Sequence, residues 1–383
     1  MINPEQKTAL LTLGRLPKAL DVARALAGAG YRVIVAEPFA WHLCRVSRSV
    51  SRSYQTPAPN DGPDRYRQAL LDIIEREQVD LVVPVSEEAM HVVLLAPALP
   101  ARTRLLASRA DLVRQLHDKQ AFIALARENK LLVPDTTRLG TEQARQLIAR
   151  EPVVIKPVYS CAGNEIAFLA AGDPLPAADP NRPLLVQKRL DGAHLSTQSL
   201  AHRGRLLGSV TYRGTLFSGT VAAGFEQAPN AAVDDWVRTF VDQTQYSGFI
   251  AFDFICDERG RPHAIECNPR LTSGIHFMEP SSLASAMLNP ASASEILLRP
   301  ATKLHQFYTT LTESQSAMFR PAKFKPYLDM MRSHRDVTWD KNDPWPFLLM
   351  TPLSWPILSR AILRGISLGE AATQDIARLS AKH

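Results

Sequence analysis

The sequence contains few cysteines, and their spacing matches no common metal site or disulfide framework. The four cysteines are Cys44, Cys161, Cys256 and Cys267, which lie far apart and form no CxxC pair. Structural zinc motifs and small disulfide-bonded scaffolds need closely spaced cysteines, so neither is indicated. Scattered cysteines are typical of a reducing compartment, and we expect the protein to be cytoplasmic.

The sequence also lacks a dense block of one charge, an internal repeat and a low-complexity segment. Lys and Arg number 44 against 38 Asp and Glu, so the net charge of +6 is small and spread over the chain. A mild basic excess suits anionic small molecules such as nucleotides. Because no aromatic-basic motif accompanies it, we expect no nucleic-acid partner. Hydrophobic residues make up 45% of the 383 residues, enough for the cores of two or three packed units.

We expect neither a signal peptide nor a transmembrane segment. The N-terminus, MINPEQKTALLTLGRLP, has no basic stretch followed by a long apolar run. The most apolar tract, residues 345–363, is interrupted by Pro346, Pro352, Pro356 and Arg360. Prolines at that density break a helix that would have to cross a bilayer.

The first third of the chain alternates strand and helix patterns, which predicts a doubly wound parallel sheet in an α/β domain. The expected strands cover residues 8–13, 31–37 and 81–85, and the expected helices cover about 17–29 and 64–78. Open α/β sheets bind ligands at the carboxyl ends of their strands. Gly14, Arg15 and Glu87 follow such strands and are therefore candidate substrate-binding residues.

The strongest chemical signal is a predicted hairpin formed by FIAFDFICD (249–257) and HAIECNPR (263–270). Side chains alternate along a strand, so Glu266, Asn268 and Arg270 share one face, and Asp253 faces them if the strands pair in register. Two carboxylates and an amide oxygen are hard ligands suited to Mg²⁺. An adjacent arginine can hold a phosphate or carboxylate. The alternative is an exposed hairpin whose polar face is only solvated.

Lys156 lies inside an apolar strand, VVIKPV, and is followed by a loop of small residues, YSCAGN (159–164). Burying a bare ammonium group is costly, so Lys156 needs a polar partner, for which phosphate is one candidate. The loop residues Ser160, Ala162 and Gly163 allow backbone N–H groups to approach phosphate oxygens. The alternative is a lysine on an edge strand whose ammonium group reaches water.

Two further segments are less informative alone. Lys119 lies within an expected helix over about 109–129, and VQKRLDG (186–192) reads as a strand that ends in a polar segment. Gln187 and the nearby backbone could contact an adenine edge, but taken alone the pattern favours an ordinary strand end.

In this order the segments resemble the ATP-grasp superfamily, in particular the carboxylate-amine ligases and the large chain of carbamoyl-phosphate synthetase. ECNPR is similar to the family's E-x-N-P-R metal motif, and the resemblance covers about residues 5–290. It implies an N-terminal α/β domain (1–108) and a two-part ATP-grasp fold of α+β type (109–290). Within the latter, the lid would span about 130–190 and the metal-binding part about 191–290, leaving 291–383 as a C-terminal extension.

The resemblance also implies roles for individual residues. Lys119 and Lys156 would bind the ATP phosphates, and a loop with Ser160, Ala162 and Gly163 would close over them. Adenine would be held by Gln187 and by the backbone of Lys188 and Leu190. Mg²⁺ or Mn²⁺ would be bound by Asp253, Glu266 and Asn268, and Arg270 would act with Lys156 in catalysis. Two positions depart from the family: the loop holds one glycine, Gly163, and His194 stands where an acidic ribose contact is common.

The implied function is an ATP-dependent ligase that converts a carboxylate into an acyl phosphate and couples it to an amine, with release of ADP and phosphate. The partners are then small carboxylates and amines, with the oligomeric state left open. A carboxylase or phosphoryl transferase of the same fold remains an alternative, as does a non-catalytic nucleotide-binding subunit. A nicotinamide-dependent dehydrogenase is disfavoured, because GRLPKAL after the first strand lacks the G-x-G-x-x-G spacing.

The apolar tract 345–363 has two interpretations. We favour core packing of Trp345, Phe347 and Trp355 between the last helices and the ATP-binding unit. Alternatively, these side chains line a pocket or surface for a hydrophobic acceptor or a lipid interface.

Overall fold

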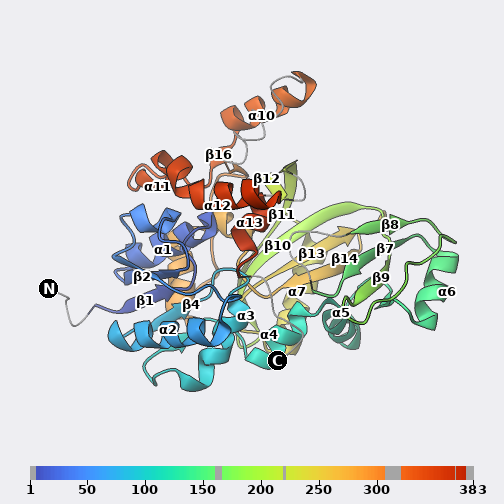
Figure 1. Cartoon of the computed structure of the whole chain (residues 1–383), viewed down its shortest axis with the longest axis horizontal. Coiled ribbons are helices and arrows are strands. Elements are labelled where there is room, and N and C mark those ends of the chain that lie inside the picture. The colour runs from blue at the N-terminus through green and yellow to red at the C-terminus, as the bar shows by residue number, and fades with distance from the viewer. Residues whose placement is uncertain (1–5, 160–165, 219–220, 307–320, 367, 377–383) are drawn as a thin grey trace.

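The computed structural model describes residues 6–159, 166–218, 221–306, 321–366 and 368–376. Figure 1 shows the N-terminal sheet at one end of the molecule, a small sheet with α6 at the other end, and a large sheet between them. The helices α11, α12 and α13 lie together along one side.

The N-terminal sheet is parallel throughout and has the strand order β3-β2-β1-β4-β5. Its strands are β1 (Thr8–Leu11), β2 (Arg32–Glu37), β3 (Arg52–Gln55), β4 (Leu81–Val83) and β5 (Arg104–Leu105), and its main helices are α1 (Pro17–Gly28) and α2 (Pro63–Arg76). The apolar strands are buried between helices, as the continuous hydrophobic runs of parallel strands require. This confirms the predicted doubly wound sheet, whose strand order reverses between β1 and β4, where ligands usually bind.

The small sheet has the antiparallel order β6-β9-β7-β8 and is covered by α6 (Glu142–Arg150). Its strands are β6 (Thr136–Arg138), β7 (Val153–Pro157), β8 (Ala167–Leu169) and β9 (Leu184–Lys188). Thr141 caps α6 by accepting a hydrogen bond from the Ala144 backbone N–H. The apolar residues of β7 and β9 pack against α6, so this sheet has a small core of its own.

The large sheet has the order β14-β13-β10-β11-β12-β15-β16. Its strands are β10 (Ala193–His202), β11 (Arg205–Ser218), β12 (Val221–Gln227), β13 (Gly248–Cys256), β14 (Pro262–Asn268), β15 (Lys303–His305) and β16 (Arg335–Asp336). Helix α7 (Ala231–Thr244) packs on it through an aromatic cluster that includes Trp236, Phe240 and Phe252. Edge-to-face contacts of this kind stabilise the sheet on which the predicted hairpin lies.

The helix expected over 109–129 is two helices, α4 (Ala110–His117) and α5 (Lys119–Glu128). Asp118 between them has extended backbone angles, and its carboxylate accepts hydrogen bonds from the backbone N–H groups of Gln120 and Ala121. This N-cap starts a new helix and places Lys119 at its first position.

The C-terminal region contains α8 (Pro280–Leu288), α10 (Pro321–Ser333), α11 (Trp345–Leu348), α12 (Met350–Arg364) and α13 (Leu368–Thr373). Within the described residues, no helix is long and apolar enough to cross a membrane. The favoured core interpretation of the apolar tract is wrong for its tryptophans, since Trp345 and Trp355 are exposed. The physical reason is that α12 buries only one side, through Met350 and Leu353. Phe347 is half-buried and packs edge-on against Trp339.

A buried charged cluster joins the N-terminal helix α1 to the segments that follow the hairpin. Asp21 on α1 is hydrogen-bonded to His276 in the short helix η3 (Ser273–Phe277), and its other oxygen lies 2.8 Å from the Arg299 guanidinium. Burial alone would raise the pKa of Asp21, but the positive charges of His276 and Arg299 hold it below the ordinary value. The ionised carboxylate is therefore part of the folded structure.

We expect Asp21→Asn to lower the free energy of unfolding by about 3–5 kcal/mol near neutral pH, because it leaves buried cations without their partner. Because folding lowers the pKa of Asp21, its ionised carboxylate stabilises the folded state fully at pH values above the unfolded pKa of about 3.9. This stabilisation is lost as the pH falls toward the folded pKa. The wild-type free energy of unfolding should thus fall more steeply below about pH 5 than that of the variant. Denaturant unfolding across this range tests it, with the exposed Asp242→Asn as control; parallel pH curves for wild type and Asp21→Asn would contradict it.

Candidate active site

The hairpin of β13 and β14 brings the predicted metal ligands together. Asp253 pairs with Glu266 across the two strands, and a register shift follows between Asp253 and Phe254. Ser196 on β10 donates a hydrogen bond of 2.6 Å to one oxygen of Asp253, and the amide nitrogen of Asn268 donates one of 3.1 Å to the other. Asp253 therefore faces Glu266 and Asn268, as in-register pairing of the hairpin requires.

The two carboxylates carry unfavourable electrostatics that a cation would relieve. Burial raises the pKa of Asp253 to about 6, and the negative charge of Glu266 acts in the same direction. Within the described residues there is no group of three or more His, Cys, Asp or Glu that could hold a metal ion. The predicted site has two carboxylates and one amide, a hard oxygen set that fits Mg²⁺ when water and phosphate oxygens complete the shell.

Two lysines from distant parts of the sequence converge on the same hairpin. The Lys119 ammonium lies 3.2 Å from a Glu266 carboxylate oxygen, and the Lys156 ammonium donates a hydrogen bond of 3.0 Å to the Ile265 carbonyl. Lys156 is buried, which lowers its pKa to about 8, while the charge of Glu266 raises it and that of Lys119 lowers it. An anionic ligand such as a phosphate would balance the positive charges of these two neighbouring lysines.

Arg270 connects the hairpin to the N-terminal sheet. Its guanidinium donates a hydrogen bond of 3.0 Å to the Asn268 amide oxygen and lies 2.6 Å from the Glu87 carboxylate. Glu87 follows β4 at the carboxyl end of the N-terminal sheet, so the expected substrate position there is adjacent to the hairpin of β13 and β14. Lys18 strengthens this junction by donating hydrogen bonds to the Ser86 hydroxyl and the Leu271 carbonyl.

Sequence reasoning missed His117 at the end of α4. Its imidazole stacks on the Tyr159 ring, with centroids 6.1 Å apart. Burial lowers the pKa of His117, the negative charge of Glu87 raises it, and the positive charges of Lys119 and Arg270 lower it. His117 is therefore close to the predicted site residues. A single histidine on a helix carries no sequence signal, and the sequence pattern predicts one unbroken helix over about 109–129.

The predicted adenine segment lies in the small sheet. Gln187 is buried and donates a hydrogen bond of 2.8 Å to the Thr136 hydroxyl, and the Lys188 ammonium pairs with Glu151 at 2.7 Å. Leu190 is half-buried just beyond β9, and His194 is exposed in β10. The predicted phosphate-loop residues Ser160, Ala162 and Gly163 lie outside the described residues.

Gly14 and Arg15 lie at the carboxyl end of β1, and their backbone N–H groups donate hydrogen bonds to the Glu37 carboxylate. The Arg15 guanidinium is buried between Glu37 and Asp375, 2.8 Å from the latter, and stacks on Phe39. The ion pair between Arg15 and Asp375 therefore connects the segment after α13 to the turn that follows β1. Its contact with a substrate stays a prediction.

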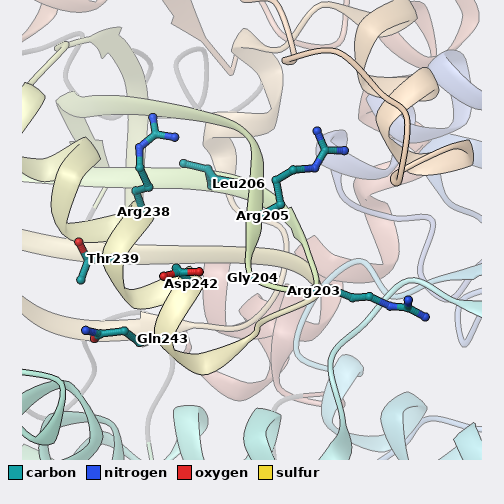
Figure 2. A pocket seen from close by; sticks show the side chains of 8 residues that line it. All are labelled: Arg203, Gly204, Arg205, Leu206, Arg238, Thr239, Asp242 and Gln243. Atoms are coloured by element: carbon teal, nitrogen blue, oxygen red, sulfur yellow. The ribbon is translucent and has the colours of Figure 1, made fainter.

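Figure 2 shows a groove elsewhere, lined by residues of α7, of the turn between β10 and β11, and of the start of β11. Its lining residues are Arg203, Gly204, Arg205, Leu206, Arg238, Thr239, Asp242 and Gln243. The three guanidinium groups do not converge on one point, and Arg205 already donates to the Ala293 carbonyl. None of the predicted site residues lines this groove.

Comparison with known families bears on this geometry. Residues 116–274 match the family described as an ATP-grasp domain. The chain contains an ATP-grasp domain. The matched stretch includes Lys119, Lys156, Asp253, Glu266 and Arg270, so the resemblance noted from the ECNPR hairpin is confirmed.

Solved structures show the same fold. Biotin carboxylase from Campylobacter jejuni is 15% identical and aligns over 77% of this chain and 74% of its own, with a TM-score of 0.60. The biotin carboxylase domain of 2-oxoglutarate carboxylase from Hydrogenobacter thermophilus, solved with MgADP and bicarbonate, is 15% identical over 76% and 71%, with a TM-score of 0.59. N5-carboxyaminoimidazole synthetase from Staphylococcus aureus, complexed with ADP, is 13% identical over 78% and 81%, with a TM-score of 0.59. No curated protein matches the sequence.

Proposed function

We propose that this ATP-grasp protein is an ATP- and Mg²⁺-dependent ligase that joins a carboxylate to an amine. The observation that carries the proposal is the convergence of Asp253 and Glu266 with Lys119, Lys156 and Arg270 on one hairpin. Two carboxylates bordered by three cations suit a metal-bound polyphosphate and its transfer to an anionic acceptor. The ADP complexes of similar folds agree with the expected use of ATP and Mg²⁺.

The proposed reaction has two steps. A carboxylate oxygen of the substrate attacks the γ-phosphorus of ATP, the bond to the bridging oxygen breaks, and ADP leaves. The amine nitrogen then attacks the acyl carbon, loses a proton, and phosphate departs with the electron pair of the C–O bond. Amide formation needs such a step because a free carboxylate has no adequate leaving group at neutral pH.

The residues of the hairpin have separate roles in this proposal. Asp253, Glu266 and Asn268 would hold Mg²⁺, and the bound ion would neutralise charge on the transferred phosphoryl group. Lys119 and Lys156 bind the phosphate oxygens, and Arg270 holds the acyl phosphate. Because Arg270 also contacts Glu87, the substrates would meet between the N-terminal unit (1–108) and the ATP-grasp unit (109–290) that we assign.

A carboxylase is the second candidate, and the similarity to biotin carboxylases and to N5-carboxyaminoimidazole synthetase favours it. Such an enzyme would phosphorylate bicarbonate in place of an organic acid, with the same hairpin. The two candidates differ only in the acid that is activated.

The test is release of ADP and phosphate by the purified protein with Mg²⁺-ATP and panels of carboxylic acids and amines. A ligase should require both an acid and an amine, and hydroxylamine should trap the acyl phosphate as a hydroxamate. Release that depends on bicarbonate assigns the carboxylase. No release with any pair, while ATP still binds, would favour the non-catalytic subunit and refute both enzymes.

A further inference from the structure

The C-terminal helices present large apolar side chains to the outside. Trp345 and Leu348 on α11 are 45% and 58% exposed, and Trp355, Ile362 and Leu363 on α12 are 64%, 73% and 85% exposed. We call these five residues the outer apolar face. Exposed apolar side chains that gather on two consecutive helices mark an interaction surface more often than chance.

Helix α12 carries apolar side chains both on the side that packs against the protein and on the side that faces outward. Met350, Leu353 and Ala361 are buried against the rest of the protein, as expected for an inner face. The opposite side carries Trp355 and Ile362 two turns apart, and its remaining members include Thr351 and Ser359 but no charged residue. A surface helix normally places charged residues there.

A short helix, η1 (Leu43–Val46), lies beside the outer apolar face and follows a further exposed tryptophan. It packs against α11 and α12, and the backbone N–H of Arg48 after it donates a hydrogen bond of 2.9 Å to Asp343, just before α11. Trp41 before it is 60% exposed, with the Arg45 guanidinium 5.2 Å from its ring. Together with Trp339, four of the five tryptophans of the chain are thus exposed in this region, whereas Trp236 is buried.

Several exposed basic side chains border this surface, and Asp340 beside Trp339 is half-buried. Between Glu37 and Asp61 the sequence has no acidic residue and three arginines, of which Arg45 and Arg48 are exposed beside α11. Arg364 is exposed at the C-terminal end of α12. Tryptophans beside arginines are the combination that binds the boundary between lipid headgroups and acyl chains.

We propose that the outer apolar face, with Trp41, Arg45 and Arg48, docks on an anionic phospholipid membrane. The 15 residues of α12 extend about 22 Å, shorter than the roughly 30 Å hydrocarbon core, so the helix lies in the plane of the interface. The indole and aliphatic side chains enter the headgroup layer, and the arginines pair with lipid phosphates. This inference is independent of the proposed ligase reaction.

The experiment is co-sedimentation of the full chain with vesicles of phosphatidylcholine alone and of phosphatidylcholine mixed with phosphatidylglycerol. The wild type should bind the mixed vesicles, more weakly at high salt, and little of it should bind phosphatidylcholine alone. Trp355→Ser combined with Ile362→Ser should lower the partition coefficient by on the order of tenfold or more. Arg45→Gln combined with Arg48→Gln should lower it on anionic vesicles only. Leu297→Ser removes an equally exposed apolar side chain elsewhere and should leave binding unchanged.

Unaltered thermal midpoints confirm that the variants fold, and Leu348→Ser with Leu363→Ser tests the same face a second time. Failure of the wild type to bind anionic vesicles overturns the proposal, as does binding that both double apolar variants retain. A lipid-free dimer that these variants dissociate would assign the face to a second copy of the chain and also overturn it.

Discussion

Glu266→Gln is expected to reduce Mg²⁺-dependent turnover by about a thousandfold or more while the protein stays folded. Glu266 lies beside Asp253 on the hairpin and pairs with Lys119 at 3.2 Å, so it would link the proposed metal to the lysine that we propose to bind phosphate. The amide of glutamine keeps the size of the side chain but removes the charge that a divalent ion requires. The measurement is ADP release as a function of Mg²⁺ concentration, together with the thermal midpoint.

The matched control is Glu258→Gln, the same chemical change at an exposed position in the turn of the same hairpin. It should behave as the wild type at every Mg²⁺ concentration. If Glu266→Gln retains near-wild-type turnover at limiting Mg²⁺, the metal assignment is wrong even when the protein proves to be an ATP-dependent enzyme.

Lys156→Met is expected to weaken ATP binding or phosphoryl transfer by on the order of a hundredfold or more. The Lys156 ammonium is buried within a cluster that contains Glu266 and Lys119, and it donates a hydrogen bond to the Ile265 carbonyl. Methionine retains the volume of the apolar stem, so the loss would report the charge. The Michaelis constant for ATP and the turnover number should be measured separately.

A purely structural Lys156 would give a different result. Its hydrogen bond joins the small sheet to β14, so its removal would then lower the thermal midpoint and leave both kinetic constants unchanged. Lys303→Met serves as control, because Lys303 is half-exposed, pairs with Glu226 and lies outside the proposed site.

Local sequence rules were sufficient for the hairpin. Side chains alternate along a strand and the turn ERGRP joins two apolar strands, so the facing of Asp253, Glu266 and Asn268 could be predicted. The β-α-β order of the first third likewise determined the parallel sheet. Both depend on neighbours within a few tens of residues, where chain geometry leaves few alternatives.

Contacts between distant segments could not be predicted in the same way. No sequence pattern near Arg15 predicts that its guanidinium will form an ion pair with Asp375. Likewise, no pattern near Glu87 predicts its ion pair with Arg270. His117 lies in the site because α4 ends at the Asp118 cap and packs against the hairpin. Such partners are selected by packing over hundreds of residues, which no local pattern records.

The apolar tract 345–363 shows most clearly which features follow from local sequence and which follow from packing. The sequence by itself determined that residues 345–363 are strongly apolar and rich in proline, which disfavours a spanning helix, although α12 continues through Pro356. It also determined the residue types of the hairpin that we propose to bind metal. Only the tertiary structure decided that Met350 and Leu353 turn inward while Trp355 and Ile362 turn outward. The physical reason is that α12 is apolar around most of its circumference, so its hydrophobic pattern does not define an inner face, and the surface against which it packs selects one.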